Sequence, residues 1–180
     1  MFKYQSGFRK NHSTDSALTY LTDSILKGFD KGYCTGMILI DLQKAFDTIN
    51  HKLLLQKMPH FGFSKNVTDW FVSYLSNRSF VVNIDRCVSS QAKLTCGVPQ
   101  GSILGPLLFL LYVNDMPQAI KSNIILYADD SCIYFQDKIS VKNIEKKLKD
   151  DFSDLCNWFL DNKLSIHFGE DKTKSILFTS

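Results

Sequence analysis

The chain has 180 residues, a length that suits one compact domain, and its 44% hydrophobic and 13% aromatic content excludes a disordered protein. Its formal charge of +3 is only mildly basic, so it permits a polyanionic partner without arguing for one. The five cysteines are scattered and never spaced as CxxC, which excludes a zinc framework and favours reduced thiols.

The N-terminal segment MFKYQSGFRKNHST has no apolar run of the kind that a secretory signal needs. The longest apolar run, residues 103–113, is interrupted by Gly and Pro and is too short to cross a bilayer. We therefore expect an intracellular protein, in the nucleus or the cytoplasm, with no membrane partner.

The first predicted elements are a helix and a strand. Ser13 or Thr14 can N-cap a helix that runs to about Lys31. The segment CTGMILIDL, residues 34–42, then reads as a buried strand that ends on an acid, Asp41.

The middle of the chain predicts two helices and a hairpin. HKLLLQKM and NVTDWFVSYLSNR have helical character and are separated by Pro59 and Gly62. SFVVNI and CVSSQAKLTC predict a hairpin that turns near Asp85 and Arg86.

The last third begins with a loop, GVPQGS, and a buried helix, ILGPLLFLLYVNDM. ILYADDSCIYF, residues 125–135, predicts two strands around adjacent acids. A long amphipathic helix follows over residues 140–162, and KLSIHF (163–168) and SILFT (175–179) predict two short strands. The four histidines have no metal-ligand spacing, and we expect them at the surface or at helix caps.

Three acids stand at the ends of predicted strands: Asp41, Asp129 and Asp130. One sheet can bring them together, and the repulsion between them would then call for a cation. Oxygen ligands suit Mg²⁺ or Mn²⁺, and two such ions can assist an in-line phosphoryl transfer. The alternative is a charged loop and a solvated turn, which composition alone favours.

Five segments occur in a recognisable order: QSGFRKNHSTDSAL, DLQKAFD, SYLSNR with CGVPQGSILGPLLF, YADD, and WFLDNKLSIHFGEDKTKSILF. Together they resemble the reverse transcriptases, in particular those of non-LTR (LINE-type) retrotransposons. The resemblance implies an α+β fold, the right-hand polymerase palm, with an antiparallel sheet backed by helices. It places partial fingers at residues 1–33 and the palm, with fingers-side helices and a hairpin, at residues 34–180.

The resemblance also implies the metal site. Asp41 and Asp129 would hold two Mg²⁺ ions, with Mn²⁺ as a possible substitute and the backbone carbonyl of Leu42 as a further ligand. Asp130 would support the site and bind metal more weakly.

Other residues acquire roles in the same way. Phe46 would be the aromatic gate that excludes a 2′-hydroxyl, although without the motif it reads as a core residue. Gln100 would contact the incoming nucleotide, Gly101 the template and Tyr127 the primer end. Arg9 would contact a phosphate, and a solvated arginine is the competing interpretation.

Lys172, in EDKTK, matches the family lysine that protonates the departing pyrophosphate, and Lys174 is close enough to compete for that position. The Asn that often precedes this motif is replaced by HFGED.

The implied reaction joins a deoxynucleoside triphosphate (dNTP) to the 3′-hydroxyl of a DNA primer on an RNA template. No counterpart of the family's thumb is found, so we expect a truncated retrotransposon fragment. The alternatives are a non-catalytic nucleic-acid-binding remnant of the same fold and an unrelated metal-dependent phosphotransferase or nuclease.

Overall fold

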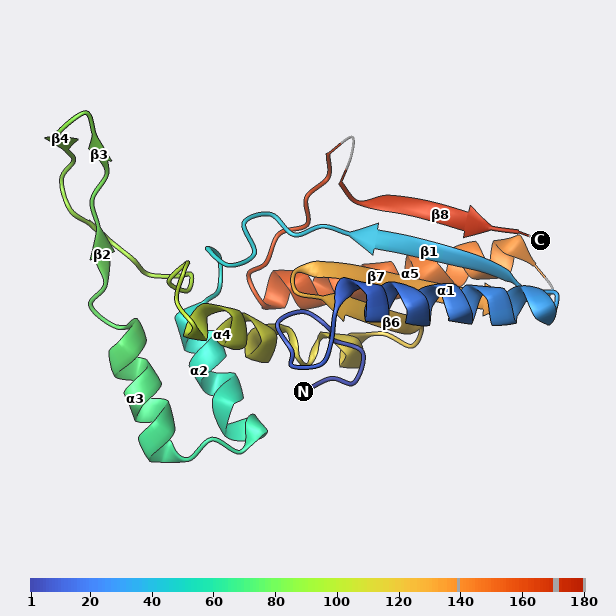
Figure 1. Ribbon diagram of the computed structural model, residues 1–180, viewed down its shortest axis with the longest axis horizontal. Coiled ribbons are helices and arrows are strands. Elements are labelled where there is room, and N and C mark those ends of the chain that lie inside the picture. The colour runs from blue at the N-terminus through green and yellow to red at the C-terminus, as the bar shows by residue number, and fades with distance from the viewer. Residues whose placement is uncertain (139, 170–171, 180) are drawn as a thin grey trace. The chain divides into compact units, whose positions relative to one another are not determined.

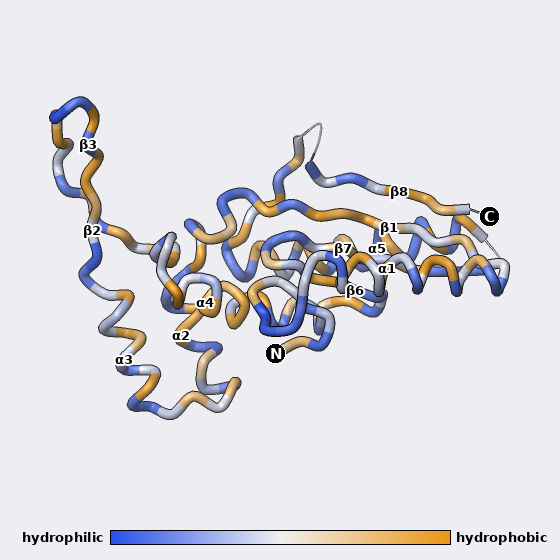
Figure 2. Tube along the Cα trace, viewed as in Figure 1, coloured by the Kyte–Doolittle hydropathy of each residue, from blue (hydrophilic) through white to orange (hydrophobic). Residues whose placement is uncertain are grey.

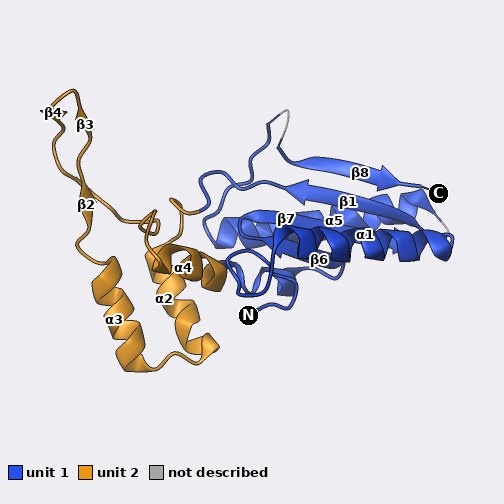
Figure 3. Ribbon diagram, viewed as in Figure 1, with its two compact units in different colours: residues 1–45, 113–180 blue, residues 46–112 orange. Residues whose placement is uncertain are grey.

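The computed structural model describes residues 1–138, 140–169 and 172–179, and the chain divides into two compact units (Figure 3). Unit 1 comprises residues 1–45 and 113–180, and unit 2 comprises residues 46–112. Within the described residues, no helix combines the length and apolar character that crossing a membrane requires.

Unit 1 is built on a four-stranded antiparallel sheet in the order β6-β7-β1-β8 (Figure 1). These strands are β1 (Cys34–Ile40), β6 (Asn123–Tyr127), β7 (Asp130–Asp137) and β8 (Lys174–Phe178). The predicted first strand and the strand pair around the adjacent acids are thus confirmed. Figure 2 shows β1 as a mostly hydrophobic segment, as expected for a central strand with both faces covered.

Helix α5 (Val141–Asp161) packs on one face of this sheet. Its apolar face contacts β1 at Gly36, where a Cβ atom would collide with the side chains of Ile144 and Leu148. Glycine at this position therefore lets the helix approach the strand closely.

Helix α1 (Thr14–Asp30) covers the opposite face, because it packs on Met37, the residue after Gly36, whose side chain points the other way. Ser13 caps this helix as predicted: its hydroxyl accepts from the backbone N of Ser16 at 3.1 Å. Figure 2 shows hydrophobic and hydrophilic residues alternating along α1, as expected for an amphipathic helix.

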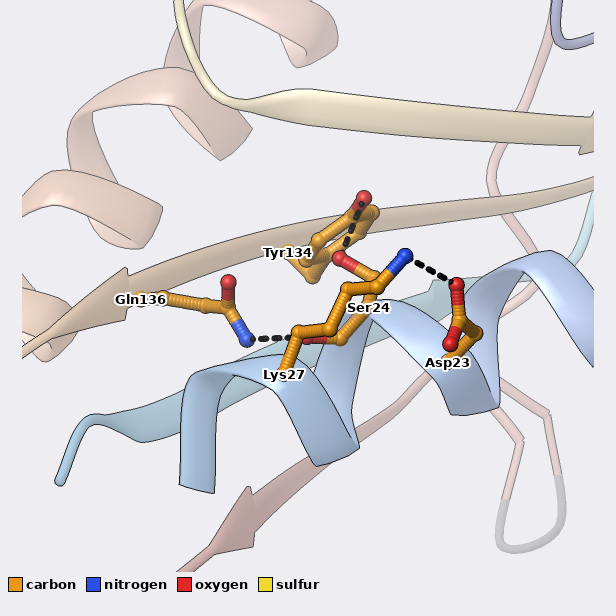
Figure 4. Close-up of polar contacts among 5 residues, drawn as sticks. All are labelled: Asp23, Ser24, Lys27, Tyr134 and Gln136. Atoms are coloured by element: carbon orange, nitrogen blue, oxygen red, sulfur yellow. Dashed lines mark hydrogen bonds and ion pairs between the residues drawn. The ribbon is translucent and has the colours of Figure 1, made fainter. Parts of the chain in front are cut away.

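The second half of α1 is tied to β7 by polar contacts (Figure 4). The Ser24 hydroxyl lies 3.2 Å from the Tyr134 hydroxyl, and the Gln136 amide donates to the Ser24 carbonyl at 3.0 Å. The Lys27–Asp23 ion pair shown beside them is exposed, so it contributes little. The anchor of α1 is therefore its C-terminal half.

The prediction of a strand over residues 163–168 is wrong, because this segment forms a single bridge and no continuous strand. Lys163 has a φ of 56°, and only Ile166 forms an isolated bridge, to Leu42. Likewise β1 ends at Ile40, two residues before its predicted end. The chain pairs in this region through separate backbone bonds, such as Gln43 N to Ser165 O at 2.8 Å, and not as a continuous ladder.

Unit 2 contains the two helices predicted for the middle of the chain and, except for its last residue, the buried helix predicted after GVPQGS. These are α2 (His51–Lys57), a 3₁₀ turn (Met58–Phe61), α3 (Lys65–Leu75) and α4 (Leu104–Val113). Every residue of α4 is apolar, which explains why most of this helix is buried.

The predicted hairpin of unit 2 is confirmed, although its strands are short. They pair as β2 with β5 and β3 with β4, over Ser79–Phe80, Ala92–Lys93, Asn83–Ile84 and Cys87–Val88. Asp85 and Arg86 form the two-residue turn with φ values of 47° and 69°. Both are left-handed, the geometry of a type I′ turn that normally favours Asn-Gly.

Candidate active site

The central strands bring two of the predicted acids together in unit 1. Ile40 pairs with Ser131 across β1 and β7, so Asp41 and Asp130 occupy the next register position at the same end of the ladder. This adjacency follows from antiparallel pairing, which places the C-terminal end of β1 beside the N-terminal end of β7.

The third acid lies in the turn between β6 and β7. Tyr127 pairs with Asp130, which leaves Ala128 and Asp129 as a two-residue connection. Ala128 is left-handed, with a φ of 56°, an uncommon conformation for a residue with a side chain.

The acids are electrostatically coupled. Burial raises the pKa of the Asp130 carboxyl above its ordinary value, and the charges of Asp129 and Asp41 raise it further. The nearby Lys172 acts in the opposite direction. The charges of Asp41 and Asp129 thus act on the Asp130 carboxyl, while the crowding of all three carboxylates stays a prediction.

Two basic side chains contact Asp41. Lys172 Nζ lies 3.2 Å from Asp41 Oδ2, and His167 Nδ1 lies 3.3 Å from the same oxygen. The backbone N of His167 also donates to the Asp41 carbonyl at 2.8 Å. His167 lies at the surface as expected, with its side chain 40% exposed, but it also contacts Asp41, which the sequence did not predict. Lys174 lies in β8 opposite Leu39.

A cleft of about 460 Å³ opens beside these groups. Asp41, Asp130 and Lys172 line it together with apolar side chains of the sheet and of the first half of α1. Cys132 also lines the cleft, and burial raises the pKa of its thiol to about 12, which keeps it protonated. The cleft thus combines an apolar wall with a group of charged side chains.

Unit 2 holds the predicted nucleotide-binding residues. The Phe46 ring stacks on Phe109 with centroids 4.6 Å apart, and the Phe46 carbonyl accepts from Val98 N at 2.9 Å. The Gln100 amide donates to Asp47 Oδ1 at 2.7 Å. Residues 46–47 are thus joined to residues 98–100, and the side chains of Phe46 and Gln100 each have a defined partner.

Gly101, also in unit 2, has a φ of 76° and nothing within 4 Å of where a Cβ atom would lie. The left-handed backbone, and not a lack of space, therefore makes glycine favourable at this position.

Arg9 and Tyr127 belong to unit 1. Arg9 Nη1 donates to the carbonyls of Phe2 at 3.0 Å and Gln5 at 2.7 Å, so part of the guanidinium organises the N-terminal loop. Tyr127 is half-buried and lines the cleft beside Asp130. A role of either residue in binding nucleic acid stays a prediction.

Comparison with known proteins decides the family. Residues 1–177 match the sequence model of the family described as "Reverse transcriptase (RNA-dependent DNA polymerase)". The chain belongs to the reverse transcriptase family.

Among its curated relatives are polymerases of Drosophila retrotransposons. The chain is 33% identical to the probable RNA-directed DNA polymerase from transposon X-element of Drosophila melanogaster, over 98% of the chain and 20% of that protein. It is 30% identical to the RNA-directed DNA polymerase from mobile element jockey of Drosophila funebris, over 99% of the chain and 20% of that protein. The chain therefore spans about one-fifth of the length of these relatives.

Solved structures support the predicted palm fold. The apo telomerase of Candida tropicalis superposes with a TM-score of 0.66 at 20% identity, over 93% of this chain and 36% of that one. A telomerase of Candida albicans in complex with a fragment of telomeric RNA gives a TM-score of 0.55 at 15% identity, over 96% of this chain and 31% of that one. The α+β reverse transcriptase palm is thus confirmed, while the boundary between fingers and palm at residue 33 stays a prediction.

The donor atoms of the acid group suit a hard divalent cation, because carboxylate oxygens are the ligands that Mg²⁺ and Mn²⁺ prefer. The charges of Asp129 and Asp41 add to burial in raising the pKa of the Asp130 carboxyl, and a bound cation would offset these negative charges. No group of three His, Cys, Asp or Glu side chains is arranged as a metal site within the described residues. Asp41 instead directs Oδ2 toward Lys172 and His167.

Proposed function

We propose that this chain is the catalytic core of an RNA-directed DNA polymerase of a non-LTR retrotransposon. The observation that carries the proposal is the convergence of Asp41, Asp130 and Lys172 on one cleft in a chain of the reverse transcriptase family. The substrates would be a dNTP, a DNA primer and an RNA template.

Asp41, Asp129 and Asp130 would hold two Mg²⁺ ions, or Mn²⁺ in their place, with the carbonyl of Leu42 as a further ligand. Bound there, the ions would supply the positive charge that an in-line attack of the 3′-hydroxyl on the α-phosphate needs. The chain's own contribution is to fix the carboxylates: β1 and β7 hold Asp41 beside Asp130 through their ladder.

Lys172 would hold the proton that the departing pyrophosphate takes up. Its position beside Asp41, 3.2 Å from Oδ2, favours it over Lys174 for this role.

Phe46 would select deoxynucleotides by excluding a 2′-hydroxyl, and its stacking on Phe109 restrains its ring for that purpose. Gln100 would contact the nucleotide and Gly101 the template. Tyr127 would lie at the primer end, and Arg9 would contact a phosphate.

Primer extension on an RNA template with Mg²⁺ tests the proposal. We would compare the wild-type chain with Asp129→Asn and with Asp154→Asn, a control that removes the charge of an exposed acid on α5. Template-directed extension that is lost only in Asp129→Asn is the expected result.

Binding of the primer–template should be measured in parallel by fluorescence anisotropy. If neither the wild-type chain nor Asp129→Asn extends the primer, and both bind the primer–template equally, the protein is a non-catalytic binding remnant. Nucleotide turnover that needs no template would indicate a different phosphotransferase.

A further inference from the structure

The N-terminal segment adds to the edge of the sheet beside β6 (Figure 1). Gln5 forms a parallel bridge with Leu126. Leu126 N donates to Tyr4 O at 3.0 Å, and Ser6 N donates to Leu126 O at 2.9 Å. Residues 4–6 therefore run alongside β6 just before the turn that carries the acids.

The Gln5 side chain reaches into that turn. It is only 1% exposed, and its Oε1 accepts from Ala128 N at 3.1 Å and from Gly7 N at 2.8 Å. Its Nε2 lies 3.4 Å from the Ala128 carbonyl. The side-chain amide of Gln5 thus hydrogen-bonds both the backbone N–H and the backbone carbonyl of Ala128, as the backbone of a neighbouring strand would.

Ala128 needs such support, because its φ of 56° is unfavourable for a residue with a Cβ atom. Turns with this geometry usually carry Gly or Asn, and the chain has neither at this position. Contacts that hold Ala128 left-handed also set the direction in which the next two residues, Asp129 and Asp130, leave the turn.

Gly7 completes the arrangement. A Cβ atom on Gly7 would lie 2.7 Å from Ala128 Cα and 2.9 Å from Ala128 Cβ, distances that real Cβ contacts do not show. The loop can therefore close on the turn only with glycine at this position.

We propose that Gln5 is a positioning residue for the acid turn. Its buried amide fixes the peptide of Ala128, and through it the carboxylates of Asp129 and Asp130. The inference rests on the proposed metal-binding function of these acids. Each contact that carries it lies within unit 1.

Amide hydrogen exchange measured by NMR tests the contact directly. Gln5→Met keeps the length of the side chain and removes its amide, and Ser6→Ala is the matched control because Ser6 bonds Leu126 through its backbone. We expect the Ala128 and Gly7 amides to exchange about tenfold faster or more in Gln5→Met, with Ile133 unchanged. Unchanged exchange at Ala128 would overturn the proposal.

A titration with Mn²⁺, followed by water-proton relaxation, tests the consequence. Gln5→Met should bind Mn²⁺ several-fold more weakly than wild type, and Ser6→Ala should not. Faster exchange at Ala128 with unaltered Mn²⁺ affinity would show that Gln5 holds the turn without positioning the acids, and would refute the inference. A wild-type chain that binds no Mn²⁺ would instead contradict the proposed function, and the exchange data would still decide whether Gln5 holds the turn.

The wild-type chain provides a test that needs no variant, in case Gln5→Met does not fold. The Ala128 amide should be protected from exchange nearly as well as that of Leu126 in β6, although Ala128 lies in a turn. An unprotected Ala128 amide would refute the inference.

Discussion

The ammonium group of Lys172 contacts Asp41 Oδ2 at 3.2 Å, so a positive side chain lies against an oxygen that a divalent ion would bind under the proposed function. Both side chains are partly exposed, at 46% and 25%, so solvent moderates the attraction between them. The lysine and a metal ion are therefore expected to affect each other's binding to this carboxylate.

This contact predicts opposite effects on metal affinity and on catalysis. Lys172→Gln should bind Mn²⁺ about two- to fivefold more tightly, because a competing positive charge is removed, yet extend a primer more slowly, because the proton donor is lost. Mn²⁺ titration and single-turnover extension would measure the two effects. Lys149→Gln, which removes an exposed lysine on α5, should change neither, and weaker Mn²⁺ binding in Lys172→Gln would contradict the prediction.

The raised pKa of Asp130 predicts how stability depends on pH without metal. Because the folded-state pKa lies above the ordinary value of 3.8, the folded protein loses stability as the pH rises from about 3.8 through the folded-state pKa. Asp130→Asn should remove this loss. In chelator at pH 7 it should unfold at a higher temperature than wild type, and its free energy of unfolding should be higher by less than about 1 kcal/mol, because the group is largely exposed.

The neighbouring variant Asp129→Asn should change stability in the same direction, since it removes one of the charges that repel Asp130. Thermal unfolding in chelator, with Asp154→Asn as control, would measure both variants. A melting temperature of Asp129→Asn that is equal to or below that of wild type would show that the acids do not repel one another as described.

The proximity of Asp41 and Asp130 could be predicted from the sequence because nearby residues determine where a strand begins and ends. Asp41 follows a buried apolar run, and Asp130 begins another, so antiparallel pairing suffices to bring them together. The two-residue turn at Asp85 and Arg86 was predictable for the same reason, since it separates two β-prone segments.

The missed residues depend on contacts that leave no local pattern. His167 lies in KLSIHF, whose alternation suggests a strand, but only Ile166 finds a bridge partner there. The Gln5 contact with Ala128 joins residues 123 positions apart through one buried amide. Neither periodicity nor composition marks a side chain that bonds to a distant backbone group, so the structure was needed to find them.

Another such residue is Asp151, whose side chain on α5 is 1% exposed. It accepts from Lys147 Nζ at 2.8 Å, from Ser122 N at 2.8 Å and from Lys121 N at 3.3 Å. Burial opposes its ionisation, but the hydrogen bonds outweigh burial and lower the pKa of the carboxyl.

Asp151→Ala should therefore destabilise the fold by about 3 kcal/mol, because two backbone N–H groups and the Lys147 ammonium lose their partner. The exposed neighbour Asp150→Ala should cost less than about 0.5 kcal/mol. Urea unfolding would measure both. Since the folded-state pKa is lowered, the contribution of Asp151 should be present above pH 3.8 and lost as the pH falls through the folded-state value.

The hairpin turn of unit 2 predicts a stabilising substitution. Asp85 and Arg86 both adopt positive φ, and the double variant Asp85→Asn with Arg86→Gly supplies residues that take this geometry more readily. The free energy needed to open the hairpin locally should rise by about 1 kcal/mol. The hairpin strands are exposed, so this opening can be measured separately from global unfolding. Amide exchange at Ser89 and Leu94, whose N–H groups donate to the carbonyls of Val82 and Arg78 at 2.9 Å, would report it as slower opening. Ser90→Gly, where φ is not positive, should loosen the hairpin, and equal exchange in the two variants would show that the turn does not limit its stability.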